Sequence, residues 1–308
     1  MNRLRVAVIG VGHLGRFHAA KYSGMKEVDL VGVVDIDSSR AKAAASEFNT
    51  NAFTDYRDVL DLVDAVSIAV PTSVHRDVAV PCLKKKVAVL LEKPMASNLE
   101  EAKEIISAAH EGGSTLQVGH LERFNPVIME LSGRIKRPMF IEAHRISPFT
   151  NRGIDVDVIL DLMIHDIDII LTFVKSDIAS VEVVGVPVLT DKIDIANARI
   201  RFSSGCIANI TASRVSADVM RKIRVFQPDS YVSIDYAKKA VDIYTMSQDK
   251  KILHNYKEIN DPDALETEIA SFVHAVLSGE RPVVDGMAGL KAMQVVKLLK
   301  DSITIPRV

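Results

Sequence analysis

Four polar side chains recur at helical spacing inside a segment that is otherwise almost entirely apolar. The segment spans residues 156–174, and the four residues are Asp157, Asp161, His165 and Asp168. At 3.6 residues per turn they fall on one face of a largely buried helix. Buried carboxylates are costly unless they are paired or neutralised, so this polar face predicts a wet cavity or a ligand. A solvated face of an ordinary amphipathic helix is the alternative.

His165 and Asp161 are the two members of this set with the most obvious chemistry. A histidine titrates near neutral pH and suits proton removal from a hydroxyl group. Asp161, one turn earlier, could orient the imidazole or bind a substrate hydroxyl. A metal site is the competing chemistry, with Asp157 or Asp168 as a third ligand. No second histidine at ligand spacing and no cysteine pair accompanies them, so we expect no metal.

A glycine-rich turn near the start of the chain predicts a phosphate-binding site. Residues 10–15 read Gly-Val-Gly-His-Leu-Gly, follow a predicted strand and open a predicted helix. Gly10 permits the tight turn, Gly12 lets a pyrophosphate approach the backbone, and Gly15 allows close packing of helix on strand. The helix N-terminus adds N–H donors and a positive dipole end. The turn therefore predicts dinucleotide binding.

An acidic residue at the end of the second predicted strand supports the same site. Asp35 lies 20 residues after Gly15, where a carboxylate accepts hydrogen bonds from the adenosine ribose diol. Because this charge should repel a 2′-phosphate, NAD is expected rather than NADP. Arg40 could stack on adenine, or it could be a plain surface residue of the next helix.

The first third of the chain alternates predicted strands and helices around these residues. The expected strands are 4–9, 28–34, 65–70, 87–91 and 115–118. The expected helices follow Gly15 to about residue 22, and then span 40–48 and 99–110, with Ser38 or Ser39 capping the middle one. This order predicts a parallel sheet with helices on both faces.

The pattern changes after about His120. Strand-like segments then follow one another at 180–186, 193–202, 206–213, 223–227, 231–235 and 241–246, with a hairpin turn at 203–205. Two helices, 264–277 and 287–300, close the chain. We therefore expect a nucleotide-binding domain over 1–121 and a second α/β domain with an antiparallel or mixed sheet over 122–308. The last helices could pack back on the first domain.

Bulk composition narrows the class of protein. Of 308 residues, 48% are hydrophobic and 25% charged, and the net charge is −2, so neither nucleic acid nor an anionic membrane is the expected partner. Two cysteines far apart form no disulfide framework. No apolar run has membrane-spanning length, and the first residues resemble no secretory signal. A cytoplasmic protein is expected.

Four short motifs, in order, resemble the Gfo/Idh/MocA family of sugar oxidoreductases over nearly the whole chain. They are the turn at 10–15, Pro-Thr-Ser-Val-His at 71–75, Glu-Lys-Pro at 92–94, and Asp161 with His165 four residues later. The resemblance implies a Rossmann domain followed by an α/β domain whose open, mostly antiparallel sheet mediates homo-oligomer contacts. It also implies a nicotinamide cofactor, and it makes Lys93, Asp161 and His165 the active-site residues.

The residues around Lys93 agree with that role. Lys93 follows a buried strand at its carboxyl end, where ligands bind to open parallel sheets, and its ammonium group could polarise the reacting oxygen. Whether Lys93 or His165 accepts the proton stays open. The chain departs from the family before Asp161, where many members have glycines. The extra carboxylates Asp155 and Asp157 could alter the substrate pocket or cap the helix.

Local sequences at 117–126, 147–149, 161–168 and 212–216 resemble one branch of the family. That branch oxidises the 3-hydroxyl of UDP-N-acetylglucosamine to a ketone, which an aminotransferase converts toward a diamino sugar of lipid A. A diphosphate requires cations, and we expect at least one of five arginines to contact it. They are Arg123, Arg145, Arg152, Arg214 and Arg221. A dehydrogenase of a free sugar or inositol and a non-catalytic nucleotide sensor are the alternatives.

These inferences define two sets of candidate site residues. The predicted cofactor-binding residues are Gly10, Gly12, His13, Leu14, Gly15, Asp35, Arg40, Pro71, Thr72, His75, Glu92 and Lys93. The predicted substrate-binding residues are His120, Arg123, Asn125, Arg152, Asp157, Asp161 and His165.

Overall fold

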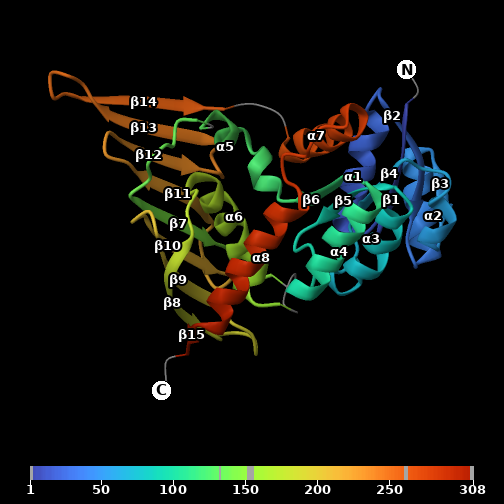
Figure 1. Ribbon diagram of the computed structural model, residues 1–308, viewed down its shortest axis with the longest axis horizontal. Coiled ribbons are helices and arrows are strands. Elements are labelled where there is room, and N and C mark those ends of the chain that lie inside the picture. The colour runs from blue at the N-terminus through green and yellow to red at the C-terminus, as the bar shows by residue number, and fades with distance from the viewer. Residues whose placement is uncertain (1–2, 132, 151–155, 260–262, 306–308) are drawn as a thin grey trace. The chain divides into compact units, whose positions relative to one another are not determined.

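A computed structural model describes residues 3–131, 133–150, 156–259 and 263–305. The chain forms two compact units. The first comprises residues 1–121 and 263–290, and the second comprises residues 122–262 and 291–308. Each unit is built around its own sheet (Figure 1).

The first unit contains a parallel sheet of six strands in the order β3-β2-β1-β4-β5-β6. Their bounds are β1 Leu4–Ile9, β2 Val28–Val34, β3 Asn51–Phe53, β4 Ala65–Ile68, β5 Ala88–Glu92 and β6 Leu116–Gly119. The central strands are buried almost throughout, because helices cover both faces of such a sheet. The predicted Rossmann-type parallel sheet is thus confirmed. Its strand order reverses between β1 and β4, the position at which such sheets bind ligands.

Five helices belong to this unit: α1 His13–Gly24, α2 Ser38–Phe48, α3 His75–Lys84, α4 Leu99–Gly112 and α7 Ala264–Ser278. The expected cap of α2 was wrong. Asp37, rather than Ser38 or Ser39, is the N-cap, because its carboxylate accepts hydrogen bonds from Ser39 N and Arg40 N. Short 3-10 helices span Tyr56–Val59 and Thr72–Val74, and a third, Leu121–Phe124, begins at the end of the unit.

Helix α7 joins the core of the first unit although it is far from that unit's strands in sequence. Its Ile269, Phe272 and Val273 belong to the same buried cluster as Val6 and Val8 of β1. Figure 1 shows α7 beside α1, with its late-chain colour against the early-chain elements. The last long helix, α8 Gly286–Asp301, has its first five residues in the first unit and the remainder in the second.

The second unit contains nine strands in the order β14-β13-β12-β11-β7-β10-β9-β8-β15. Their bounds are β7 Phe140–Ile146, β8 Ile178–Val186, β9 Ile195–Phe202, β10 Ile207–Ser213, β11 Met220–Phe226, β12 Ser230–Asp235, β13 Ala240–Met246, β14 Ile252–Glu258 and β15 Ile303–Thr304. Most pairs are antiparallel, while β7 with β10 and β8 with β15 are parallel. The predicted mixed sheet is confirmed, although β7, β14 and β15 were not predicted from the sequence.

The two faces of the nine-stranded sheet differ in character. Along β7, alternate residues are buried, and the residues between them are half-buried. On the less buried face, one aromatic ring per strand lies in register across β7, β11, β12, β13 and β14, with centroids 4.3–5.6 Å apart. This aromatic row consists of Phe140, Phe226, Tyr231, Tyr244 and His254.

The helix expected over 156–174 is divided into two kinds of helix. A π-helix spans Ile159–Met163, and α6 continues as a regular α-helix over Ile164–Phe173. The π-helical segment packs beside β10, and α6 packs beside β7. A short helix, α5 Pro126–Glu130, precedes β7. Single π-helical turns inside α-helices are frequent at functional sites, and this one contains Asp161.

Candidate active site

The glycines of the first turn meet three different steric environments. Gly10 has φ = 86°, and a Cβ there would lie 2.7 Å from Ala69 O. A Cβ at Gly15 would collide with Gly10 O, whereas a Cβ at Gly12 would have no protein atom within 4 Å. The backbone at Gly12 therefore faces open space that a pyrophosphate can fill, which fits a dinucleotide.

Asp35 lies at the end of β2 and supports this turn directly. Its carboxylate is 6% exposed and accepts hydrogen bonds from Val11 N at 3.1 Å and Asp37 N at 3.0 Å. Arg40 is half-exposed and lies 3.3 Å from both carboxylate oxygens of Asp35. Each oxygen can accept a further hydrogen bond, so Asp35 remains suited to a ribose diol. A contact between Arg40 and adenine stays a prediction.

Five predicted site segments follow five strands at the same edge of the parallel sheet. In the spatial order of the sheet, Asp35 follows β2, Gly10 follows β1, Pro71 comes soon after β4, Lys93 follows β5, and His120 follows β6. Ligands of open α/β sheets bind at this carboxyl edge, near the switch point between β1 and β4. The topology thus gathers the candidate cofactor residues along one line.

His75 forms hydrogen bonds with two of these segments, the one that follows β4 and the one that follows β5. Its ring is buried, with Nδ1 3.0 Å from Pro94 O and Nε2 2.9 Å from Val70 O. Burial lowers the pKa of His75. Thr72 opens the short helix that leads into α3 and is half-buried. The Lys93–Pro94 peptide bond is cis.

The sequence analysis missed a polar partner of Glu92. His18 on α1 is 1% exposed, and its Nε2 lies 3.0 Å from Glu92 Oε1. Gly15, His18, Ala19 and Tyr22 share the buried face of α1. The i, i+3, i+4, i+7 spacing of that face could have identified His18 as a buried polar residue that needs a partner.

In the second unit, the polar stripe of 157–168 divides into residues with different roles. Asp157 accepts hydrogen bonds from Ile159 N and Leu160 N and pairs with Lys300 at 2.6 Å, so it caps the start of the π-helix. Asp168 is 1% exposed and binds Arg123 through both oxygens, at 2.6 and 2.7 Å. The expectation of one wet face was therefore too simple.

Asp161 and His165 are the half-buried members of the stripe. Asp161 lies within the π-helix and His165 in the first turn of α6, so the junction between the two helix types separates them. Their spacing of four places them about one turn apart, where a carboxylate can orient an imidazole.

Three of the five candidate arginines are held by carboxylates within the second unit. Arg123 pairs with Asp168 as described above. Arg145 binds Asp166 at 2.9 and 3.0 Å and Glu122 at 2.9 Å. Burial, which by itself disfavours the charged form, is outweighed by these carboxylates, so the pKa of Arg145 is raised. These contacts stabilise the fold and leave little capacity for a diphosphate.

Arg214 is the third of these arginines. It is 5% exposed, with Nε 2.8 Å from Asp194 Oδ1 and Nη2 2.8 Å from Val156 O. Arg221 differs, because it is exposed at the start of β11 and lies in register opposite Arg145. Arg152 lies outside the described residues.

The other predicted substrate residues also have structural contacts. Asn125 caps α5, with Oδ1 accepting from Val127 N at 3.2 Å, and its amide donates to Glu122 at 3.1 Å. His120 is 2% exposed. Their contact with a substrate stays a prediction.

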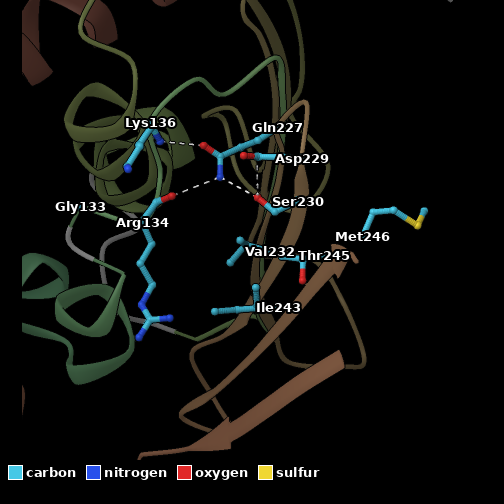
Figure 2. A pocket seen from close by; sticks show the side chains of 10 residues that line it. All are labelled: Gly133, Arg134, Lys136, Gln227, Asp229, Ser230, Val232, Ile243, Thr245 and Met246. Atoms are coloured by element: carbon cyan, nitrogen blue, oxygen red, sulfur yellow. Dashed lines mark hydrogen bonds between the residues drawn. The ribbon is translucent and has the colours of Figure 1, made fainter. Parts of the chain in front are cut away.

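A cavity of about 500 Å³ lies in the second unit, between the loop before β7 and strands β12 and β13 (Figure 2). Gln227 spans it. Its amide oxygen accepts hydrogen bonds from Lys136 N and Arg137 N, and its amide nitrogen donates to Arg134 O and Ser230 Oγ. Because these groups satisfy one another, Gln227 joins the loop to the sheet, and none of the predicted site residues lines the cavity.

Within the described part of the chain, no three His, Cys, Asp or Glu side chains are placed together to hold a metal ion. No helix in the same residues is long and apolar enough to cross a membrane.

Comparison with known proteins agrees with a nicotinamide-dependent oxidoreductase. Residues 4–120 match the oxidoreductase family with an NAD-binding Rossmann fold, and residues 128–227 match the GFO/IDH/MocA C-terminal domain. The chain is 39% identical over 300 residues to UDP-N-acetylglucosamine 3-dehydrogenase of Acidithiobacillus ferrooxidans, covering 95% of each. It is 25% identical over 313 residues to myo-inositol 2-dehydrogenase of Thermotoga maritima, covering 94% of this chain and 93% of the other.

Solved structures give the same result. A structure of the Acidithiobacillus ferrooxidans UDP-N-acetylglucosamine 3-dehydrogenase matches with a TM-score of 0.93 at 37% identity, covering 98% of each chain. Levoglucosan dehydrogenase with NADH and L-sorbose shares the fold alone, with a TM-score of 0.88 at 18% identity over 98% of this chain and 97% of the other. The chain belongs to the Gfo/Idh/MocA family of oxidoreductases, and its first unit is an NAD-binding Rossmann domain.

Proposed function

We propose that this protein oxidises the 3-hydroxyl of UDP-N-acetylglucosamine to a ketone, with NAD as the hydride acceptor. The observation that carries this proposal is the 39% identity to an enzyme of that activity over 95% of both chains. The line of site residues along the carboxyl edge of the parallel sheet supports it. Relatives that act on inositol are less similar over comparable lengths, which makes a free polyol the second candidate.

The Rossmann unit would hold the dinucleotide through Gly12, Asp35 and the N-terminus of α1. NAD supplies the hydride-accepting nicotinamide when it is bound. Asp35 lies where a 2′-phosphate would be repelled, which favours NAD over NADP. The steric freedom at Gly12 and the turn at Gly10 support this assignment.

Lys93, Asp161 and His165 would serve the same reaction. An ammonium group at Lys93 stabilises negative charge on the reacting oxygen. An imidazole at His165 accepts or relays the hydroxyl proton, with Asp161 setting its orientation. Lys93 and His165 remain alternative first acceptors of the proton.

Arg221 is the cation that we favour for the diphosphate of the substrate. Among the described residues its side chain has no hydrogen bond or ion pair, in contrast to Arg123, Arg145 and Arg214. Arg221 lies opposite Arg145 on β11, in the same unit as Asp161.

The biological setting follows from the same proposal. The product, a 3-keto sugar nucleotide, suits an aminotransferase as the next enzyme. We place the reaction in the cytoplasm, which the two free, buried cysteines support. We also infer a homo-oligomer formed through the aromatic row, because aromatic side chains are enriched at protein interfaces.

The direct test is an absorbance assay of reduced cofactor with the purified protein and NAD. UDP-N-acetylglucosamine is compared with UDP-glucose, free N-acetylglucosamine and myo-inositol, and an aminotransferase removes the ketone. We expect reduction with UDP-N-acetylglucosamine alone. Reduction with inositol or a free sugar instead would overturn the substrate and keep the oxidoreductase class. Replacing Arg221 by Gln should raise the KM for the UDP-sugar about tenfold, the order of one lost charged hydrogen bond.

A further inference from the structure

A continuous line of hydrogen bonds runs through the interior of the Rossmann unit and ends beside Lys93. Tyr22 OH lies 2.8 Å from Ser67 Oγ, which lies 3.1 Å from His18 Nδ1. His18 Nε2 then lies 3.0 Å from Glu92 Oε1. Tyr22, Ser67 and His18 are each at most 1% exposed, so bulk water does not compete for these bonds. We call these four residues the buried line.

The chemistry of the four groups determines which atom donates each hydrogen bond of the buried line. An ionised carboxylate only accepts hydrogen bonds, so His18 Nε2 must carry the proton toward Glu92. In a neutral imidazole Nδ1 is then an acceptor, and it receives the Ser67 hydroxyl. Burial raises the pKa of Tyr22, which therefore stays protonated and donates to Ser67. Each donor in the line points toward Glu92.

Glu92 is held on several sides at the end of β5. Its Oε2 accepts a hydrogen bond from Lys93 N at 3.3 Å, and its side chain is only 12% exposed. A Cβ added at Gly119 on β6 would lie 3.2 Å from Glu92 Oε2, so the neighbouring strand packs closely against the carboxylate. The position of the Glu92 carboxylate and the start of the Lys93 turn are therefore coupled.

A second buried carboxylate, Glu268, lies close enough to Glu92 for their charges to interact, and the two differ in their hydrogen bonds. Glu268 on α7 is fully buried, and neither of its carboxylate oxygens has a hydrogen-bond partner among the described residues. Burial and the charge of Glu92 raise its pKa well above the ordinary value, so Glu268 is neutral. Burial acts on Glu92 in the same direction, but the hydrogen bond from His18, the charge of Lys93 and the hydrogen bond from Lys93 N outweigh it and lower its pKa.

Glu92 is thus the ionised carboxylate of this interior. The titratable groups that surround it are His18 and Tyr22 on α1, His75 on α3, Glu268 on α7, and the adjacent Lys93. His75 and Lys93 both interact electrostatically with its charge. The carboxylate of Glu92 and the ammonium group of Lys93 therefore attract each other, and His18 holds the carboxylate in place.

We propose that His18 is a positioning residue for the oxidation: it holds the ionised carboxylate of Glu92 in place, and Glu92 in turn fixes the backbone and the charge of Lys93. The inference rests on the proposed function, which gives Lys93 its part in proton transfer. His18 itself touches neither the reacting atoms nor the cofactor in this proposal.

Three variants test the proposal against a matched control. E92Q keeps size and removes the charge, H18L removes the donor, and H18Q keeps an N–H donor that can reach Glu92. We expect kcat to fall about tenfold or more in E92Q and H18L, with KM for the alcohol changed less than about twofold and the pH profile of kcat displaced. H18Q should recover most of kcat. Lys21→Gln, a half-buried residue of α1 whose ammonium group pairs with Asp263 and Glu266, should leave both quantities unchanged.

A second readout does not need turnover. Acetic anhydride labels neutral amines, and peptide mass spectrometry gives its rate at Lys93 at one fixed pH. We expect E92Q to raise that rate about fivefold, because Lys93 loses the carboxylate with which it interacts. Calorimetric NAD binding and thermal unfolding show whether each variant is folded.

The outcomes separate this proposal from the proposed function. Unchanged kcat, pH profile and Lys93 labelling in E92Q and H18L would overturn it. Equal losses in H18L and H18Q that follow the folded fraction would also overturn it, because His18 would then be structural only. If the wild-type protein oxidises none of the alcohols, the proposed function fails, and the labelling rates still decide the link from Glu92 to Lys93.

Discussion

Two glycines of the dinucleotide turn are needed for different reasons, one for the fold and the other for binding the cofactor. Gly15 is required by the fold, because a Cβ there would collide with the backbone carbonyl of Gly10. Gly12 has no such neighbour, and its Cβ would point into open space. Sequence reasoning predicted both roles from the spacing alone, since the fingerprint encodes close packing at one glycine and phosphate approach at the other.

Replacing the two glycines by alanine should therefore give opposite results. Gly15→Ala should lower the free energy of unfolding by about 1–3 kcal/mol through overpacking. Gly12→Ala should cost about 1 kcal/mol or less, as an N-cap change, and weaken NAD binding about tenfold or more. Denaturant unfolding and calorimetry measure the two effects. Equal stability losses at both positions, with equal NAD affinity, would contradict this division.

Lys93 provides the test of the chemistry itself. Lys93→Met keeps the length of the side chain but removes the ammonium group, so turnover should fall about a thousandfold or more while NAD affinity changes little. Stopped-flow or steady-state cofactor reduction measures the rate, and calorimetry measures NAD binding. Substantial activity in the variant would show that Lys93 is not part of proton transfer.

At the scale of elements, the start of the π-helix is held in place by contacts with Arg214 and Ile193 of the second unit. Arg214, at the end of β10, donates to Val156 O and Ile193 O and pairs with Asp194. Val158 N also donates to Ile193 O at 3.1 Å. The segment that carries Asp161 and His165 thus begins from a fixed point rather than from a flexible loop.

The ion pair between Asp194 and Arg214 makes these contacts sensitive to acid. Asp194 is fully buried, which alone would raise its pKa, but hydrogen bonds from Thr190, Val188 and Leu189 lower it well below the ordinary value. A depressed pKa in the folded state gives stability that is complete above the unfolded pKa of about 4 and is lost as pH falls through the folded value.

Asp194→Asn should accordingly lower the free energy of unfolding at neutral pH by about 3 kcal/mol, because Arg214 is left buried without its charge partner. Below about pH 4 the difference from wild type should shrink. Denaturant unfolding across pH measures it. Asp191→Asn, at an exposed pair, is the control and should change stability by about 0.5 kcal/mol or less. A constant difference at every pH would refute the linkage.

The elements that the sequence did not predict share a physical cause. The π-helix repeats about every 4.4 residues, but the apolar pattern of 156–174 fits an α-helix equally well, so periodicity could not reveal it. Strand β14 is exposed along its whole length, so it carries no hydrophobic alternation. The ion pairs of Arg145 and Arg214 join segments far apart in sequence, and pairing of that kind leaves no local signal.

For the whole molecule, fold class was predictable because it depends on repeated, redundant patterns. Alternating strands and helices defined the Rossmann sheet, and a run of strands defined the mixed sheet. Individual site contacts were less predictable. Residue type suggested that Arg123 and Asp157 bind substrate, but the structure gives each of them a structural partner.

The aromatic row makes a prediction about assembly. Tyr231→Lys places a charge in the middle of the row, and burying that charge against a partner would be costly, so the proposed oligomer should dissociate toward monomers. Sedimentation velocity measures the change. Leu253→Lys, an exposed position of β14 on the opposite face, should leave assembly unaltered. An unchanged oligomer in the Tyr231 variant would place the interface elsewhere.

The return of α7 to the Rossmann core has a consequence for biosynthesis. The N-terminal strands are synthesised first, yet Ile269 and Phe272, which cover part of their apolar surface, come more than 140 residues after the last strand of the parallel sheet. The nascent nucleotide-binding domain therefore remains incomplete until α7 has been synthesised, and it exposes that surface to chaperones in the meantime. For the same reason, residues 1–121 are not an interchangeable module. A gene fusion that transplants them alone would leave part of their core behind.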